Sequence, residues 1–235
     1  MRRSSAASRR SSIPSSSSVG VLSPCSAPQV IRGSHRSMRP QIVESVRQAL
    51  AANPKTTISD PSLTLAGVML LLYVKDGQEW VLLSRRSQTV VQHKGEISFP
   101  GGTADETDGT MLDTALREVH EEIGVRREDV EVLGALDDLR TSTRFLISPY
   151  VGFIEYPYPF RTNGEVSELV EVPLAALTDE VNQRDDVRVL DGMPTVFPCF
   201  SYNRQLIFGA TARILERFVD LMAQASDGHG PWRRR

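Results

Sequence analysis

The stretch GTMLDTALREVHEEIG, residues 109–124, determines how the rest of this chain is interpreted, because it combines a helical apolar pattern with a cluster of acids. At about 100° per residue the apolar side chains fall on one stripe, and Gly124 is a natural left-handed residue after the last turn. The pattern therefore predicts an amphipathic helix that is anchored by its stripe. The stripe comprises Leu112, Ala115, Leu116, Val119 and Ile123.

Three carboxylates, Glu118, Glu121 and Glu122, fall together on the flank beside this stripe. Like charges at such spacings repel by roughly 0.2–0.5 kcal/mol per pair. A helix face that is merely solvated usually interleaves Lys, whereas Arg117 is the only cation inside this cluster. Converging carboxylates are the oxygen ligands that Mg²⁺ prefers, commonly together with substrate phosphates.

The segment SFPGGTADETDG, residues 98–109, leads into the predicted helix. Its paired glycines, Gly101 and Gly102, allow the backbone to approach a ligand closely. A glycine-rich loop before clustered acids indicates a site for a metal-bound phosphate compound. The residues alone leave a second interpretation open, in which the acids form the solvated face of a structural helix.

The composition suits a globular protein and argues against two functional classes. The 235 residues are 40% hydrophobic and 24% charged with a net charge of −2, so the whole chain is not a polyelectrolyte that binds nucleic acid. No apolar run reaches the ~18 residues that span a bilayer. The two cysteines, Cys25 and Cys199, do not have the spacing of a metal site or a disulfide scaffold, which favours a reducing compartment. We expect Cys199 to be a small core residue.

Apolar periodicity and turn residues predict the remaining elements. The pair Asp76-Gly77 predicts a tight hairpin, because both residues accept a positive φ. Helices are expected over residues 40–52 and 208–225. Strands are expected over residues 63–74, 130–136, 145–154, 187–190 and 195–200.

The ends of the chain differ from residues 41–225, which we expect to form one domain. Residues 1–40 are rich in Ser and Arg and contain no Lys, Asp or Glu, so we expect them to be disordered. We favour a start codon assigned too early, since Met38 would open the chain equally well. An organellar transit peptide is the second interpretation, and a basic arm for an acidic partner is the third. The tail over residues 226–235 is also expected to be disordered.

The run REVHEEIGV, residues 117–125, resembles the signature of the Nudix hydrolases, Arg-Glu-apolar-x-Glu-Glu-x-Gly-apolar, at all nine positions. The first half of the signature departs from the common pattern. Gly102 is followed by Asp108 where a Glu is usual, and one extra residue separates Gly102 from Arg117. This longer spacer resembles one branch of the family, the coenzyme A pyrophosphatases.

A second motif, LLSRRSQTVVQHKGEISFPGG over residues 82–102, also resembles that branch. The departures are Ser84, which is mild, and Val91, where the branch has an arginine. Nearby cations that would compensate are Arg85, Arg86, His93 and Lys94. The matching positions are Leu82, Leu83, Arg86, Ser87, Gly95, Phe99, Pro100, Gly101 and Gly102.

The resemblance implies a metal-dependent hydrolysis of a diphosphate. Glu118 and Glu122 are expected as ligands of Mg²⁺ or Mn²⁺, with Glu121 as a third ligand or as the residue that orients a metal-bound water. Arg117 is expected to pair with these carboxylates and position them. Substrate contacts are expected from Arg86, Gly101 and Gly102. For coenzyme A the products would be 4′-phosphopantetheine and adenosine 3′,5′-bisphosphate.

The implied fold is an α/β/α sandwich around a mixed sheet, with a loop-helix-loop catalytic motif. His120 is expected on the helix surface, because the family signature accepts any residue there. The implied partner is a small-molecule diphosphate, without nucleic acid or membrane. A cytoplasmic location is expected, or a mitochondrion or plastid if the N-terminal segment is a transit peptide. The sequence leaves the oligomeric state open, a homodimer included.

Three rival functions remain on the sequence. The nearest is a Nudix enzyme for another diphosphate, such as a nucleotide sugar, a dinucleotide or a nucleoside triphosphate. A catalytically inactive Nudix domain used for binding is less favoured, because a binding module has no need for repelling carboxylates. A nucleic-acid binder that uses the seven arginines before Gln41 is the third.

Overall fold

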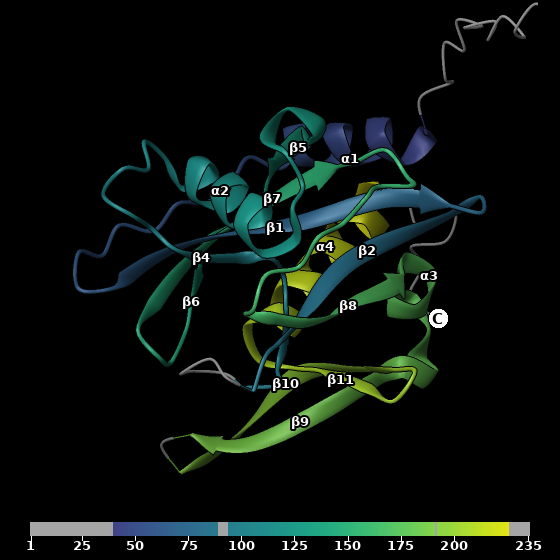
Figure 1. Cartoon of the computed structure of the whole chain (residues 1–235). Helices are drawn as coiled ribbons and strands as arrows, with labels where there is room; N and C mark the ends of the chain where they lie inside the picture. Colours follow the sequence, from purple (N-terminus) through teal and green to yellow (C-terminus); the bar gives the residue numbers. More distant parts are fainter. Residues whose placement is uncertain (1–39, 89–93, 191, 226–235) are drawn as a thin grey trace, which may run out of the picture. The chain divides into compact units, whose positions relative to one another are not determined.

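The computed structural model describes residues 40–88, 94–190 and 192–225. Within them the chain forms a large mixed sheet, a smaller antiparallel sheet and four α-helices (Figure 1). Apart from Pro40, the two predicted terminal segments lie outside the described residues, as do Val91 and His93.

The central strand of the large sheet is β1 (Thr64–Lys75). It pairs antiparallel with β2 (Gln78–Arg86) on one side and parallel with β7 (Phe145–Phe153) on the other. The remaining strands pair with these three: β3 (Ile97–Ser98) and β8 (Val166–Pro173) with β2, β4 (Gly101–Thr103) with β1, and β5 (Glu131–Ala135) and β6 (Leu139–Arg140) with β7. Because β1 is covered on both faces, its sequence is almost continuously apolar.

Helices cover both faces of this sheet, because successive residues of a strand point to opposite sides. Met69 and Leu71 of β1 pack in one core cluster with α2 (Met111–Ile123). Leu70 and Leu72 pack in the other cluster, with α1 (Gln41–Ala52) and α4 (Gly209–Ala225). In Figure 1, α2 lies in front of the central strands and α4 behind them. The expected α/β/α sandwich with a mixed sheet is confirmed.

The turn between β1 and β2 is the predicted hairpin. Asp76 and Gly77 have φ angles of 52° and 75°, so both take the left-handed conformation that a tight two-residue hairpin requires. The turn fixes the register of the two strands, with Lys75 opposite Gln78 and Leu71 opposite Leu82. It therefore determines which residues of β2 reach the end of the sheet where β3 and β4 begin.

A three-stranded antiparallel sheet follows β8 and the short helices α3 (Leu174–Thr178) and η2 (Glu180–Asn182). Its order is β11 (Gln205–Ile207), β10 (Met193–Tyr202) and β9 (Gln183–Leu190). Phe200 and Ile207 are buried in the same core cluster as α4, so one end of this sheet is anchored to the domain.

Most predicted elements occur within a few residues of their expected bounds, and Cys199 is buried as expected. The expectation for residues 187–190 was too short, because β9 begins at Gln183. Strand β8 was not predicted, because Ser167, Glu168 and Glu171 interrupt its apolar residues. In the described part of the chain, no helix is both long and apolar enough to cross a membrane.

Candidate active site

The acidic helix α2 forms as its sequence predicts. Thr110 caps its start by accepting a hydrogen bond from the Asp113 amide at 3.1 Å, and Gly124 ends it with a φ of 72°. The buried stripe contains Ala115, Leu116, Val119 and Ile123, whereas Leu112 is only partly buried. His120 is exposed, as expected.

The three carboxylates on the flank of α2 lie in different environments. The side chain of Glu122 is 4% exposed and that of Glu118 is 17% exposed, whereas that of Glu121 is 52% exposed. Glu118 and Glu122 therefore face the sheet, and Glu121 faces solvent. The expectation of one shared flank did not distinguish them, although at about 100° per residue Glu122 lies nearest the apolar stripe and Glu121 lies opposite it.

Glu122 is a buried acid between a backbone amide and an arginine. Its carboxylate accepts a hydrogen bond from the Gly101 amide at 3.3 Å and lies 3.7 Å from Nη1 of Arg86. Burial, together with the charge of Glu118, raises the pKa of Glu122 to about 7, against the opposing effects of Arg86 and Gly101. The anionic form of Glu122 is therefore disfavoured unless a cation approaches it.

Glu118 occupies space beside β4 that exists because residue 102 is glycine. A Cβ at Gly102 would lie 2.6 Å from Cδ of Glu118, which is closer than real contacts allow. Burial raises the pKa of Glu118, although its hydrogen bond from Arg117 opposes the shift. The charge of Glu118 in turn raises the pKa of Glu122, so the two carboxylates interact directly.

Arg117 connects α2 to the loop that precedes it. Its guanidinium donates to Glu118 at 2.8 Å and to Glu121 at 3.2 Å. The same group donates to both carboxylate oxygens of Asp108, at 3.1 and 3.0 Å, and to the Thr103 carbonyl at 3.1 Å. These bonds hold the pKa of Asp108 well below its ordinary value. Asp108, the spacer acid of the signature, thus fixes the guanidinium that holds Glu118.

Arg86 reaches the carboxylates from β2. Its Nη1 lies 3.7 Å from Glu122, and its Nη2 lies 3.8 Å from Glu165, in the turn before β8. Its Nε is buried and, within the residues that the structure describes, has no hydrogen-bond partner. A buried donor without a partner is costly and suits a ligand acceptor. The structure thus brings Arg86 to the same place as Gly101, Glu118 and Glu122.

Glu165 is a site residue that sequence reasoning missed. Its charge raises the pKa of both Glu118 and Glu122, so it lies near both. It comes from the segment NGEVSELVEVPL, over residues 163–174, which carries no acid cluster on a helix and gave no sign of its position. Only the pairing of β8 with β2 brings this turn beside Arg86.

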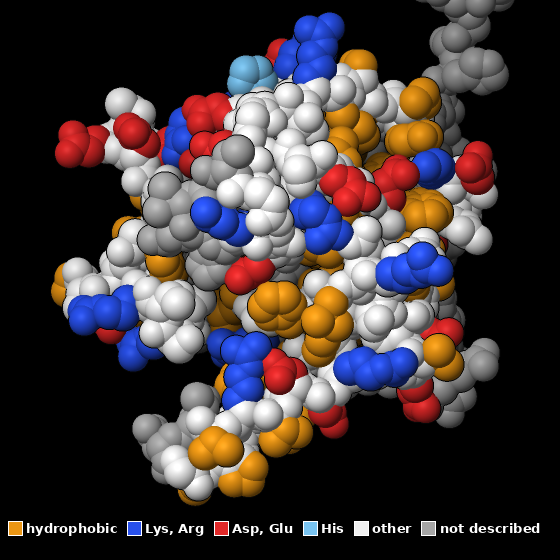
Figure 2. Space-filling model, turned by 60° about the horizontal axis from the view of Figure 1, so that its bottom comes forward, with side chains coloured by type: hydrophobic (Ala, Val, Ile, Leu, Met, Phe, Trp, Pro, Cys, Tyr) orange, Lys and Arg blue, Asp and Glu red, His pale blue; other side chains and the backbone are white. Residues whose placement is uncertain are grey.

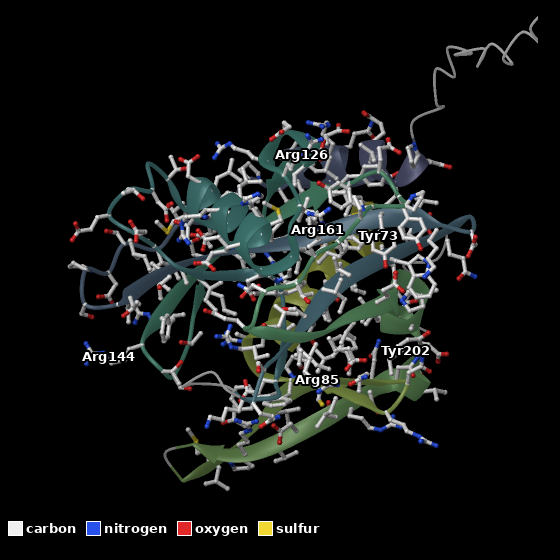
Figure 3. The ribbon with its side chains drawn as sticks, in the orientation of Figure 1. Tyr73, Arg85, Arg126, Arg144, Arg161 and Tyr202 are labelled. Carbon is white, nitrogen blue, oxygen red and sulfur yellow. The ribbon has the colours of Figure 1, made fainter. Side chains whose placement is uncertain are left out.

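Arg85, the neighbour of Arg86, is fully engaged elsewhere. It donates to Glu168 at 3.0 Å, to the Gly95 carbonyl at 2.9 Å and to the side chain of Gln205 in β11. Figure 3 shows Arg85 extending from β2 toward the three-stranded sheet. The register of β2 against β8 shifts between Arg85 and Arg86, and the two side chains reach different partners, so they have different roles.

The donor set fits a hard divalent cation. Glu118 and Glu122 supply carboxylate oxygens that interact unfavourably with each other, and a cation would relieve this repulsion. In residues 40–88, 94–190 and 192–225, no three His, Cys, Asp or Glu side chains converge as a ready-made metal site. The expected third ligand, Glu121, is half exposed and accepts from the same Arg117 nitrogen as Glu118. We therefore treat Glu118 and Glu122 as the candidate metal pair.

A surface hollow of about 570 Å³ lies on the outer side of α2. Its lining includes Asp108, Arg117 and His120 but neither Glu118 nor Glu122. This hollow therefore borders the arginine that positions the carboxylates and not the carboxylates themselves.

Comparisons with known proteins identify the family. Residues 63–192 match the NUDIX domain family. The chain aligns over 151 residues, at 38% identity, with "Uncharacterized Nudix hydrolase NudL" of Pectobacterium atrosepticum. This alignment covers 63% of this chain and 76% of the relative. It is 36% identical over 156 residues to the protein of the same name from Photorhabdus laumondii, with coverages of 66% and 82%. Among solved structures, a MutT/nudix family protein from Enterococcus faecalis aligns at 15% identity with a TM-score of 0.47, over 79% of this chain and 71% of that one.

Proposed function

Because this chain belongs to the Nudix family and is a Nudix pyrophosphatase, we propose that its substrate is coenzyme A or a derivative of it. The products are then 4′-phosphopantetheine, or its derivative, and adenosine 3′,5′-bisphosphate. Water adds to one phosphorus of the diphosphate, the bridging P–O bond breaks, and the bridging oxygen leaves with the other phosphate.

The observation that carries this proposal is the contact between two separate motifs. Arg86 and Gly101 belong to the upstream motif that resembles the coenzyme A pyrophosphatases, and Glu122 belongs to the Nudix helix. Arg86 lies 3.7 Å from Glu122, and the Gly101 amide donates to it at 3.3 Å. The residues that distinguish the branch therefore lie directly against the residues that define the superfamily.

We assign the metal ligands to Glu118 and Glu122, with Glu121 as a residue that must turn away from Arg117 to take part. When bound, Mg²⁺ or Mn²⁺ supplies neutralisation of the diphosphate charge and acidification of water. Arg117 is a positioning residue, because it holds Glu118 and is itself held by Asp108.

Arg86 has the free donor that a diphosphate oxygen needs. Its Nε is buried without a partner, and its two terminal nitrogens lie 3.7 and 3.8 Å from Glu122 and Glu165. A charge-assisted hydrogen bond from Nε to a phosphate oxygen would satisfy this donor. We keep Gly101 and Gly102 as substrate contacts through their backbone, because their strand lies directly beside the carboxylates of Glu118 and Glu122.

The 3′-phosphate of coenzyme A is an anion that a cation would recognise. Val91, which stands where the branch has an arginine, offers no charge, so another cation is required. Of the two described alternatives outside the carboxylate cluster, Arg85 is engaged by Glu168, Gly95 and Gln205. Lys94 is exposed at the turn before β3. We therefore assign the 3′-phosphate to Lys94.

The experiment is hydrolysis of coenzyme A in water enriched in ¹⁸O, with Mg²⁺ or Mn²⁺ and with a chelator as control. The expected result is two products with the masses of 4′-phosphopantetheine and adenosine 3′,5′-bisphosphate, one of them carrying a single ¹⁸O. Release of only the 3′-phosphate, or no cleavage at all, would overturn the coenzyme A assignment.

A further inference from the structure

Exposed apolar side chains are concentrated at the far end of the three-stranded sheet. Val187 and Val189 of β9 and Val196 of β10 are 60%, 72% and 58% exposed. Figure 2 shows hydrophobic side chains on the projecting lower end of the molecule, which β9 and β10 form. Concentrated exposed apolar surface of this kind marks an interaction site more often than scattered single residues do.

These side chains share one face of the sheet. Val187 lies opposite Val196, and Val189 lies opposite Pro194. Following the alternation along β10, the same face carries Phe200, which lies opposite Ile207 of β11 and is buried against the core. The apolar face is therefore covered where the sheet joins the domain and uncovered toward its tip.

Strand β9 is also an edge. The sheet order places it at the end, and among the described residues its partner is β10 alone. The outer edge of such a strand presents unpaired amides and carbonyls to any strand that fits beside it. The edge and the bare apolar face thus belong to the same strand.

We propose that β9 pairs antiparallel with β9 of a second copy of this chain, with the two-fold axis at Val187. A two-fold axis makes the contact self-complementary. Val187 then meets its own copy, Val189 lies opposite Asp185 of the other copy, and Val196 of both copies lies on the same face. Asp186 of each copy lies opposite Arg188 of the other, which gives two symmetric pairs of opposite charge.

The charge pattern selects this register over its neighbours. If one β9 strand is shifted along the other by one residue, the apolar face of one copy lies beside the charged face of the other. The next registers that keep the faces matched have the two-fold axis at Asp186 or at Arg188. In these registers Asp186 or Arg188 lies directly opposite the same residue of the other copy, so like charges meet. The register centred on Val187 avoids both arrangements, and residues 184–190 of the two strands then lie opposite each other.

The paired charges are already aligned at the edge. Arg188 donates to Asp186 of its own strand at 2.7 Å, and its guanidinium lies 5.8 Å from the ring centre of Phe197. A guanidinium has five donors, so Arg188 can hold a carboxylate of each copy. The occupant that fits this surface is therefore a second copy rather than an unrelated apolar peptide.

The first test is the mass of the full chain by sedimentation, in which we expect a dimer. Asp186→Arg and Arg188→Asp should each weaken the dimer by roughly tenfold or more, since about 1.4 kcal/mol corresponds to a factor of ten. The double variant Asp186→Arg/Arg188→Asp should restore it. Mixing the two single variants should also restore it, as a heterodimer, because their charges complement each other.

Arg184→Asp is the matched control, because Arg184 lies opposite Leu190 of the second copy and has no charged partner there. It should leave the dimer unchanged. A wild-type monomer at micromolar concentration would overturn the proposal. So would single variants that dimerise normally, a double variant that fails to recover, or an Arg184→Asp variant weakened to the same extent.

Discussion

The carboxylate of Glu118 lies where a side chain at Gly102 would stand. A Cβ built on Gly102 would be 2.5 Å from Oε1 of Glu118, and the neighbouring Gly101 amide donates to Glu122. The glycine pair therefore determines how close the acidic helix lies to β4. The two buried carboxylates owe their position to this contact.

Gly102→Ala should remove most of the diphosphate hydrolysis while leaving the fold intact. The backbone of Gly102 is not in the left-handed region, so alanine is strained only through its collision with Glu118. Displacing a catalytic group by about 1 Å can cost roughly a hundredfold in rate. The measurement is kcat/KM together with the melting temperature. The control is Gly164→Ala, whose Cβ meets nothing within 4 Å, and equal activities of the two variants would refute this role for Gly102.

Glu122→Gln should abolish nearly all activity and leave stability unchanged or slightly higher. Burial and the charge of Glu118 disfavour the Glu122 anion, whose pKa is about 7, and a glutamine oxygen can still accept from Gly101. We expect at least a tenfold loss in kcat/KM, equivalent to about 1.4 kcal/mol. The exposed Glu44→Gln on α1 serves as the control. A Glu122→Gln enzyme that kept more than a tenth of the wild-type rate would contradict the assignment.

Asp138 should link stability to acid pH. Burial opposes its ionisation, but hydrogen bonds from Lys55, Ser148 and the Ile58 amide outweigh this and hold the pKa of Asp138 below 3.8. A depressed folded-state pKa stabilises the fold above the unfolded value of 3.8, and this contribution is lost as pH falls through the folded-state value.

Asp138→Asn should therefore lower the free energy of unfolding at pH 7 by about 1–3 kcal/mol, because Lys55 and Ser148 lose a charged partner. The difference from wild type should shrink below pH 3.8. Urea unfolding at several pH values measures it, and Asp76→Asn in the exposed β1–β2 turn should leave the curve in place. A difference that stays constant down to the acid limit would show that the ionised pair is not the cause.

Wild-type enzyme should prefer coenzyme A over dephospho-coenzyme A by roughly tenfold or more, because a charge-assisted contact to phosphate contributes ~1.5–3 kcal/mol. Lys94→Ala should remove this preference, whereas Val91→Arg should keep or increase it. Side-by-side kcat/KM values for the two substrates provide the readout. Equal values in wild type, with a preference appearing only in Val91→Arg, would show relaxed recognition and reject the role of Lys94.

The sequence predicted the elements whose physics is local. The apolar stripe of α2, its end at Gly124 and the Asp76-Gly77 hairpin depend on residue spacing and on backbone conformations that few residues accept. Strand β1 was recognisable because burial on both faces leaves a continuous apolar run. These elements already placed the acidic helix against a sheet.

The remaining features depend on pairing between distant segments. Glu165 reaches Arg86 only because β8 pairs with β2. The engagement of Arg85 depends on Gln205, which is 120 residues away in the chain. Such contacts are properties of the assembled sheet and have no local sequence pattern.

The most direct test of the central claim is kcat/KM of the purified chain, with Mg²⁺ and with Mn²⁺, for coenzyme A, a nucleotide sugar, a dinucleotide and a nucleoside triphosphate under identical conditions. Coenzyme A should be cleaved at its diphosphate with a kcat/KM roughly tenfold or more above the others, equivalent to about 1.4 kcal/mol of transition-state binding. Undetectable cleavage of coenzyme A beside rapid cleavage of any of the other three would contradict it.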